Sequence, residues 1–317
     1  MNTLYFITQQ TMYFAIPLLI VALGGMFSER SGIVNIALEG IMVVGAFAGI
    51  GFINIFQNTM SGQTLLLLAV LVSAVAGALF SLFHAFAAIN LKADQTISGT
   101  ALNLFAPAFA VFTARMIQGV QQIQFTDTFY IRKVPFLGDI PVLGPMFFRN
   151  AYMTTYIGFA IFLISWFVIN NTRFGLRLRA CGEHPQAADS VGINVYNIRY
   201  AGVIISGVLA GIGGLTFVVP TSTNFNATVA GYGFLALAVL IFGQWRVKKI
   251  FVAAFFFGIM KTFASAYSGI PFLKVLPISN EVYKMIPYIA TLVVLTFSSR
   301  NSQAPRAEGI PYDKGSR

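Results

Sequence analysis

Charged residues are scarce in this chain of 317 residues, because 20 Lys and Arg and 10 Asp and Glu make up only 9% of it. Soluble domains average about 25% charged residues. Apolar residues reach 57%, 32 residues are Phe, and the mean hydropathy is +0.76. No water-soluble fold of this size buries so much apolar surface and covers itself with so few charges. The composition excludes a soluble enzyme, a nucleic-acid-binding protein and a disordered chain, and it predicts an integral membrane protein.

Residues that carry catalysis or bind metals are also scarce. The single cysteine, Cys181, excludes an intrachain disulfide. The two histidines, His84 and His184, fall in different segments, and no Cys/His cluster is available for zinc. The sequence has neither a G-x-x-x-x-G-K-[ST] loop for nucleotide phosphates nor an H-E-x-x-H metal helix. We therefore expect no catalytic, cofactor or metal site. If the protein drives an energy-requiring process, the energy must come from a partner protein or an ion gradient.

Long apolar runs dominate instead, and about 20 such residues span a bilayer. They predict an all-α polytopic membrane protein, a bundle of about 8–10 transmembrane helices with nine favoured. The predicted spans are 11–27, 33–56, 64–89, 97–117, 152–169, 200–220, 231–243, 250–267 and 285–297. The run 231–243 is short enough for a re-entrant hairpin as well as a tilted span, and we favour the span. Residues 1–300 are expected to form one transmembrane domain and 301–317 a cytoplasmic tail.

The loop charges predict the orientation, because Lys and Arg concentrate in cytoplasmic loops. If the loop 171–199 is cytoplasmic, the inside basic residues are Arg30, Lys92, Arg173, Arg177, Arg179, Arg199, Arg246, Lys248, Lys249, Arg300, Arg306, Lys314 and Arg317. The outside residues are Arg115, Arg132, Lys133, Arg149, Lys274 and Lys284. This bias predicts nine crossings, an N terminus outside the cell and a C terminus in the cytoplasm. The loop 118–150 is then a long outer loop, either a docking surface or a solvated cover.

The loop 171–199 contains a short predicted helix with defined ends. Pro185 suits the first helical position, where its missing N–H would be unpaired anyway. Gly192 suits the left-handed residue that ends a helix. Ala187, Ala188 and Val191 are expected to share an apolar face between them. Because so short a helix needs a surface to pack on, it either docks into another protein or is an ordinary capped surface helix.

This loop resembles the coupling-loop signature of bacterial ABC importer permeases, in the superfamily of ribose and branched-chain amino-acid permeases. The ATPase-coupling residues that the resemblance implies are Arg179, Gly182, Glu183, Pro185, Ala187, Ala188, Asp189 and Gly192. Segments similar to the nucleoside-type branch are 28–40, 139–145, 236–243, 286–288 and 304–313. One departure is the run Arg246-Val-Lys-Lys249, which is more basic than the family motif after Gly243.

The resemblance implies the translocation subunit of an ATP-driven ABC importer in the bacterial cell membrane, for nucleosides or else for a simple sugar or branched-chain amino acid. The implied partners are two cytoplasmic ABC ATPase subunits, which bind the ATP, and a second related permease or a second copy of this chain. An extracytoplasmic substrate-binding lipoprotein, membrane lipid and the small-molecule solute complete the set, and no nucleic acid is expected. An ion-coupled secondary transporter is the alternative from another class. It would usually show more intramembrane ionisable groups and an internal repeat.

Polar residues inside the predicted spans are candidates for the translocation pathway. Glu39 lies six residues past Ile33, about 9 Å along a helix and inside the apolar layer. Asn35 is expected on the same helix face, four residues earlier, and Asn103 lies midway along the fourth span. A carboxylate at this depth must face protein or water. The three side chains either line the solute pathway or clamp helices together, Glu39 by bonding a backbone amide or Arg30.

Overall fold

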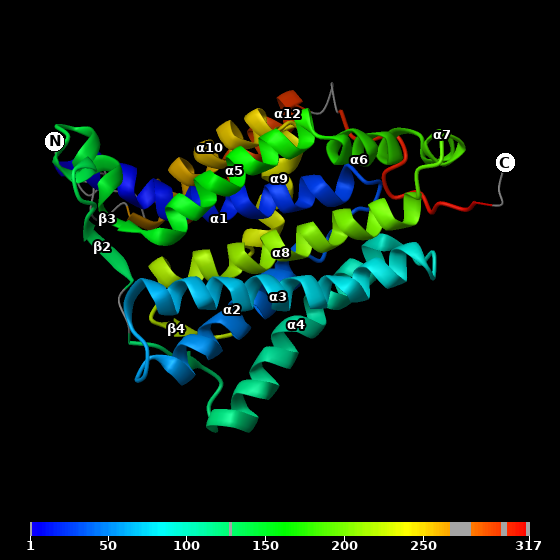
Figure 1. The fold of residues 1–317 in the computed structure, drawn as a ribbon. Coiled ribbons are helices and arrows are strands. Elements are labelled where there is room, and N and C mark those ends of the chain that lie inside the picture. The colour runs from blue at the N-terminus through cyan, green and yellow to red at the C-terminus, as the bar shows by residue number, and fades with distance from the viewer. Residues whose placement is uncertain (1, 127–128, 267–279, 299–302, 315–317) are drawn as a thin grey trace.

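The computed structural model describes residues 2–126, 129–266, 280–298 and 303–314, and most of these are helical (Figure 1). The long helices are α1 (Asn2–Glu29), α2 (Leu38–Phe56), α3 (Gly62–Ile89), α4 (Gln95–Gln118), α5 (Met153–Asn171), α8 (Val195–Thr221), α10 (Val247–Ala266) and α12 (Asn280–Ser298). The shorter helices are α6 (Arg173–Glu183), α7 (Pro185–Ser190) and α9 (Tyr232–Phe242). The predicted all-α fold is confirmed.

Among the described residues, six helices, α1 to α5 and α8, are long and apolar enough to cross a bilayer, and α9 is a shorter apolar helix. In lipid a backbone must satisfy its own hydrogen bonds, which is why apolar segments of this length are helical. Large apolar side chains point outward along these helices, among them Leu71, Leu104, Phe112 and Leu163, each at least 60% exposed. Such a surface suits lipid and not water, and the chain is a multi-pass membrane protein.

Helix α8 lies at the centre and packs against α1, α2 and α3. Glycine makes these contacts close. A Cβ at Gly45 of α2 would clash with the backbone of Gly211 of α8, and a Cβ at Gly207 would clash with Ser81 of α3. Because lipid supplies no hydrophobic force between helices, small residues that let backbones approach are the usual basis of their packing.

The bundle has two distinct ends (Figure 1). The N terminus lies at one end with β2 (Tyr130–Lys133) and β3 (Arg149–Tyr152), which pair antiparallel. Helices α6 and α7 and the C-terminal residues lie at the other end. Termini at opposite ends are what an odd number of crossings produces. Lys274, Arg300 and Arg317, which entered the charge count, lie outside the described residues.

The described part of the predicted outer loop, residues 118–126 and 129–150, covers the N-terminal end (Figure 1). Between β2 and β3 it forms two short turns, η1 (Leu137–Asp139) and η2 (Gly144–Phe148). Hydrogen bonds attach it to α1, because the Gln9 amide donates to the Pro145 carbonyl (2.9 Å) and the Tyr13 hydroxyl to the Asn150 carbonyl (2.6 Å).

The short apolar run at 231–243 forms α9 and passes toward the α7 end of the bundle. On its N-terminal side, β4 (Asn224–Phe225) pairs with β1 (Ile123–Gln124), which follows α4. On its C-terminal side, the Trp245 indole N–H donates to the Glu29 carboxylate at the far end of α1 (2.5 Å). The Trp245 carbonyl accepts from Arg30 (3.1 Å). The chain therefore runs along the bundle here and does not turn back, although α9 has only 11 residues and a span over 231–243 stays a prediction.

Helix α2 begins at Leu38 and not at Ile33, so the predicted start of the second span is wrong. Residues 33–37 are irregular, and side chains from neighbouring helices satisfy their backbone. The bonds run from Ser28 Oγ to Ile33 O (2.7 Å), from Val34 N to Gln95 Oε1 (2.7 Å) and from Asn103 Nδ2 to Ile36 O (2.8 Å). Non-helical backbone at membrane depth is tolerated only where protein or water satisfies it in this way.

Candidate functional site

The carboxylate of Glu39, in the first turn of α2, caps the N-terminus of α9. Its oxygens accept from the amides of Gly231 (2.9 Å) and Gly233 (2.6 Å). Gly231 has φ of 76°, and a Cβ at Gly233 would clash with the backbone of Glu39. The first amides of a helix have no acceptor within it and carry partial positive charge. A carboxylate placed there is stabilised without Lys or Arg, so Glu39 forms the interhelical clamp through backbone amides and not through Arg30.

Asn103 performs the same task at the start of α2. Its Oδ1 accepts from the Gly40 amide (2.7 Å). Asn35 is fully buried and donates from Nδ2 to the Ser206 hydroxyl of α8 (2.9 Å). Asn35 and Glu39 do not share a helix face, because Asn35 precedes α2, so that expectation is wrong. Contact between these side chains and a transported solute stays a prediction.

The sequence did not predict the residues that hydrogen-bond with Glu39, Asn35 and the backbone before α2. Gln95, Ser206, Gly231 and Gly233 supply these bonds. A signal for the two glycines exists, because Gly231-Tyr-Gly233 stands between a polar stretch and an apolar run and marks a helix start. Nothing in the sequence pairs that start with Glu39, which lies 192 residues before Gly231.

The coupling segment, residues 173–192, lies at the opposite end from the N terminus (Figure 1). Helix α7 begins at Pro185 and is followed by Gly192 with φ of 84°, which confirms both predicted ends. Gly182 is in close contact with α1, because a Cβ there would clash with the Arg30 carbonyl. Glu183 lies 3.7 Å from the Arg30 guanidinium. The segment is thus fixed against the end of α1.

Ala187, Ala188 and Val191 do not share one face, so that expectation is wrong. Ala188 is buried and packs with Cys181, Val195 and Tyr312 of its own chain. Ala187 is exposed, and Val191 is 74% exposed. Ala188 follows Ala187 by one residue, about 100° around the helix, and so faces inward. A bulky residue at Ala188 would disturb this chain before it could test a partner contact.

Residues 303–314 form a strap across the same end, hereafter the C-terminal strap. The amide of Ala307 donates to the Gly182 carbonyl (2.8 Å), and that of Gly309 to the Gly32 carbonyl (3.1 Å). The guanidinium of Arg199, 1% exposed, donates to the Ile310 carbonyl (3.2 Å). The strap therefore joins α6 to the segment after α1 and to α8.

Ion pairs and burial hold the C-terminal strap further. Lys92 pairs with Asp313 (2.8 Å), and Asp189 of α7 lies 4.0 Å from Lys314. The Glu308 carboxyl hydrogen-bonds that of Glu29, and burial raises the pKa of Glu308 to about 7. A hydrogen bond between two carboxyl groups requires that one of them carries a proton.

Cys181 provides a natural reporter for the C-terminal strap. It is fully buried with Tyr312 in its cluster, and burial raises the pKa of its thiol to about 11. Since the thiolate is the reactive form, we expect very slow maleimide labelling in native membranes.

Tyr312→Ala should expose the Cys181 thiol and raise its labelling rate at least tenfold, measured by gel shift. The control is Tyr130→Ala, because Tyr130 lies on β2 at the opposite end of the bundle and outside the cluster of Cys181 (Figure 1). Equal labelling rates in both variants would contradict the covering role of the strap.

The helical bundle, the irregular stretch before α2 and the short helices α6 and α7 between α5 and α8 are those of a multi-span membrane protein. Residues 7–295 match the family described as the permease component of the branched-chain amino acid transport system, and the chain belongs to this family. It is 46% identical to the guanosine ABC transporter permease NupQ of Bacillus subtilis, over 98% of this chain and 97% of NupQ.

Two further relatives are named as ABC transporter permeases. The nucleoside ABC transporter permease NupC of Lactococcus lactis is 42% identical over 99% of this chain and 98% of NupC. The guanosine ABC transporter permease NupP of Bacillus subtilis is 25% identical over 89% of this chain and 78% of NupP. No solved structure matches the chain. The chain is a membrane transport subunit of the permease type.

Proposed function

We propose that this chain is the translocation subunit of an ATP-driven importer of nucleosides. The observation that carries this proposal is the similarity to NupQ and NupC along nearly their whole lengths, since both are named as permeases for guanosine or nucleosides. The chain performs no chemistry in this role. It supplies a path across the membrane, and separate subunits bind and hydrolyse the ATP.

The proposed partners are two cytoplasmic ABC ATPases, a second permease and an extracytoplasmic substrate-binding lipoprotein. Bacillus subtilis has two different proteins named as guanosine ABC transporter permeases, NupQ and NupP, which supports pairing with a related permease and not with a second copy. The exposed residues of α7, Gln186, Ala187 and Ser190, together with Val191, are proposed to contact an ATPase.

In the proposed orientation the α7 end is cytoplasmic and the N-terminal end is outside the cell. Basic residues support it, because Arg30, Arg179, Arg246 and Lys248 gather near α6, as the positive-inside rule expects. The folded cover formed by β2, β3 and the turns between them then faces the lipoprotein.

The contacts of the coupling segment suggest how ATPase movement reaches the membrane helices. Closure of the ATPases displaces α7. Helix α7 follows α6, whose Gly182 contacts the residue after α1, and Ala188 of α7 packs with Val195 of α8. Because α8 packs on α1, α2 and α3, these helices move with it. ATP shifts the transporter between outward-open and inward-open states only by binding one of them more tightly.

Uptake of labelled solutes by cells lacking this chain tests the proposed substrate. We expect uptake of guanosine and uridine to fall at least tenfold, while uptake of ribose and leucine stays unchanged. Re-expression of the chain is the control and should restore nucleoside uptake. A loss of ribose or leucine uptake alone would contradict the substrate class while leaving the transport role intact.

A further inference from the structure

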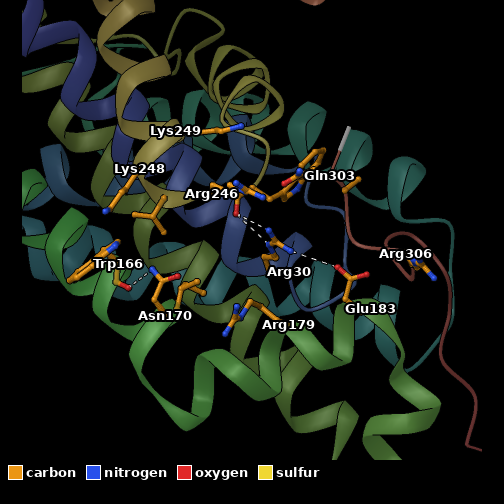
Figure 2. Close-up of a pocket in the computed structure, with 14 residues that line it drawn as sticks. Arg30, Trp166, Asn170, Arg179, Glu183, Arg246, Lys248, Lys249, Gln303 and Arg306 are labelled. Atoms are coloured by element: carbon orange, nitrogen blue, oxygen red, sulfur yellow. Dashed lines mark hydrogen bonds and ion pairs between the residues drawn. The ribbon is translucent and has the colours of Figure 1, made fainter. Parts of the chain in front are cut away.

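A basic cavity of about 900 Å³ lies at the α6 end of the bundle, and the proposed function does not use it (Figure 2). It is open on one side and is lined by the last turns of α5, by α6, by the start of α10 and by the first residues of the C-terminal strap. Its lining contains the cations Arg30, Arg179, Arg246, Lys248, Lys249 and Arg306. Glu183 is the one acid among the described lining residues. A cavity with this charge balance attracts an anion.

Three of these cations already have hydrogen-bond partners, because Arg179 Nε also donates to the Gly175 carbonyl (3.3 Å), and two are available. Arg30 donates to the Trp245 carbonyl, and Lys249 Nζ lies 2.5 Å from Gln244 Oε1. Arg246 and Lys248 are exposed, and within the described part of the chain neither side chain makes a hydrogen bond or ion pair, although Lys248 lies over the Trp166 ring. Figure 2 shows Arg246 beside Arg30, whereas Arg306 points away from both.

The start of α10 adds backbone donors to the same cavity. Val247, Lys248 and Lys249 form the first turn of this 20-residue helix, and all three line the cavity. Amides in a first turn have no acceptor within the helix and carry partial positive charge. Backbone amides and mobile cations together are the usual components of a phosphate site.

Another wall of the cavity contains residues that are typical of the membrane–water interface. Trp166 is partly exposed, and Lys248 Nζ lies 5.6 Å from the centre of its ring. Trp and Lys are typical of the interface between lipid tails and headgroups. Burial lowers the pKa of Arg30, and the charges of Arg179 and Arg246 lower it further, against the opposite effect of Glu183. The cations therefore repel one another, and a bound anion would relieve that repulsion.

We infer that this cavity binds a phosphate group, held by Arg246, Lys248 and the first amides of α10 and carried either by an anionic phospholipid headgroup or by a small soluble phosphate. Basic recesses between membrane helices on the cytoplasmic side commonly bind such headgroups. The inference does not depend on which solute the protein transports.

The test measures binding to the intact transporter purified in detergent. The probes are phosphatidylglycerol, phosphatidylcholine and inorganic phosphate, with bound species counted by native mass spectrometry. The variant is Arg246→Gln/Lys248→Gln, at exposed positions that should leave folding intact. The matched control is Arg173→Gln/Arg177→Gln, which removes two exposed charges from α6 outside the cavity lining. The melting temperature without added lipid verifies that both variants fold.

We expect phosphatidylglycerol affinity to fall about thirtyfold in the cavity variant, since each Lys or Arg near an anionic headgroup contributes about fivefold. The control variant and phosphatidylcholine binding should change less than threefold. If inorganic phosphate binds with the same dependence on Arg246 and Lys248 and the lipid does not, the phosphate site stands and its source is soluble. Equal losses in both variants, or no binding of either phosphate probe, would overturn the inference. Loss of the ATPase subunits from the cavity variant with lipid binding unchanged would also overturn it.

Discussion

Glu39→Ala should remove most of the folded protein from the membrane. The substitution leaves the amides of Gly231 and Gly233 buried without the carboxylate that now accepts from both. Hydrogen bonds to charged groups each contribute about 1.5–3 kcal/mol, so the loss is about 3–6 kcal/mol. Proteins are stable by only about 5–15 kcal/mol in total, and the start of α9 would detach from α2. The amount of monodisperse protein after mild solubilisation, with its melting temperature, measures the effect.

Glu39→Gln separates the clamp from a pathway role. One side-chain oxygen remains to accept a single amide, and the new NH₂ group faces the other amide, so we expect an intermediate loss of folded protein. Asp139→Ala is the control, because it removes an exposed carboxylate from the cover at the N-terminal end. A normal amount of folded Glu39→Gln protein with altered uptake would assign Glu39 to the solute pathway. A normal amount of folded protein with normal uptake would contradict both the clamp and the pathway role.

Val191→Glu should abolish uptake while leaving the membrane bundle folded. Val191 is 74% exposed at the end of α7, so no packing within this chain opposes the change. In a dry contact with an ATPase, an unpaired carboxylate is disfavoured by about 3–5 kcal/mol, or about two to four orders of magnitude in affinity. We expect the ATPase subunits to be lost on purification. Nucleoside-stimulated ATP hydrolysis should be lost with them.

The control for this prediction is Val120→Glu. It makes the same chemical change at a valine that is 54% exposed just after α4, near the other end of the bundle. Its ATPase content should match that of the unchanged protein. Uptake at the normal rate by the Val191→Glu transporter, with its ATPases bound, would show that α7 does not transmit their movement.

The long helices were predictable because a membrane span is a local property. A window of about 20 apolar residues determines it, and no knowledge of distant residues is needed. The short helix α7 was predictable for the same reason, since Pro185 and Gly192 act on the backbone at their own positions. The positions of Gly62–Ile89 and Gln95–Gln118 follow directly from their apolar runs, whereas α1 begins at Asn2, nine residues before its predicted start at Thr11.

The parts that could not be predicted depend on long-range contacts. The irregular stretch before Leu38 exists because Gln95 and Asn103, far along the chain, bond its backbone. A pattern of apolar residues carries no information about such bonds, so it predicts that the second helix begins at Ile33. Ala188 faces inward for a similar reason, because Tyr312 of the C-terminal strap packs with it. The strap itself has no apolar periodicity, and its docking depends on backbone hydrogen bonds.

Purification of the tagged chain from its native membrane, followed by a nucleotide hydrolysis assay, tests the central claim most directly. The account predicts that ABC ATPase subunits and a second permease copurify with it. It also predicts that guanosine, delivered with the lipoprotein in reconstituted vesicles, stimulates ATP hydrolysis and enters the lumen only when ATP is present. A chain that purifies alone and accumulates nucleoside in vesicles in response to a proton or sodium gradient, without ATP, would contradict it.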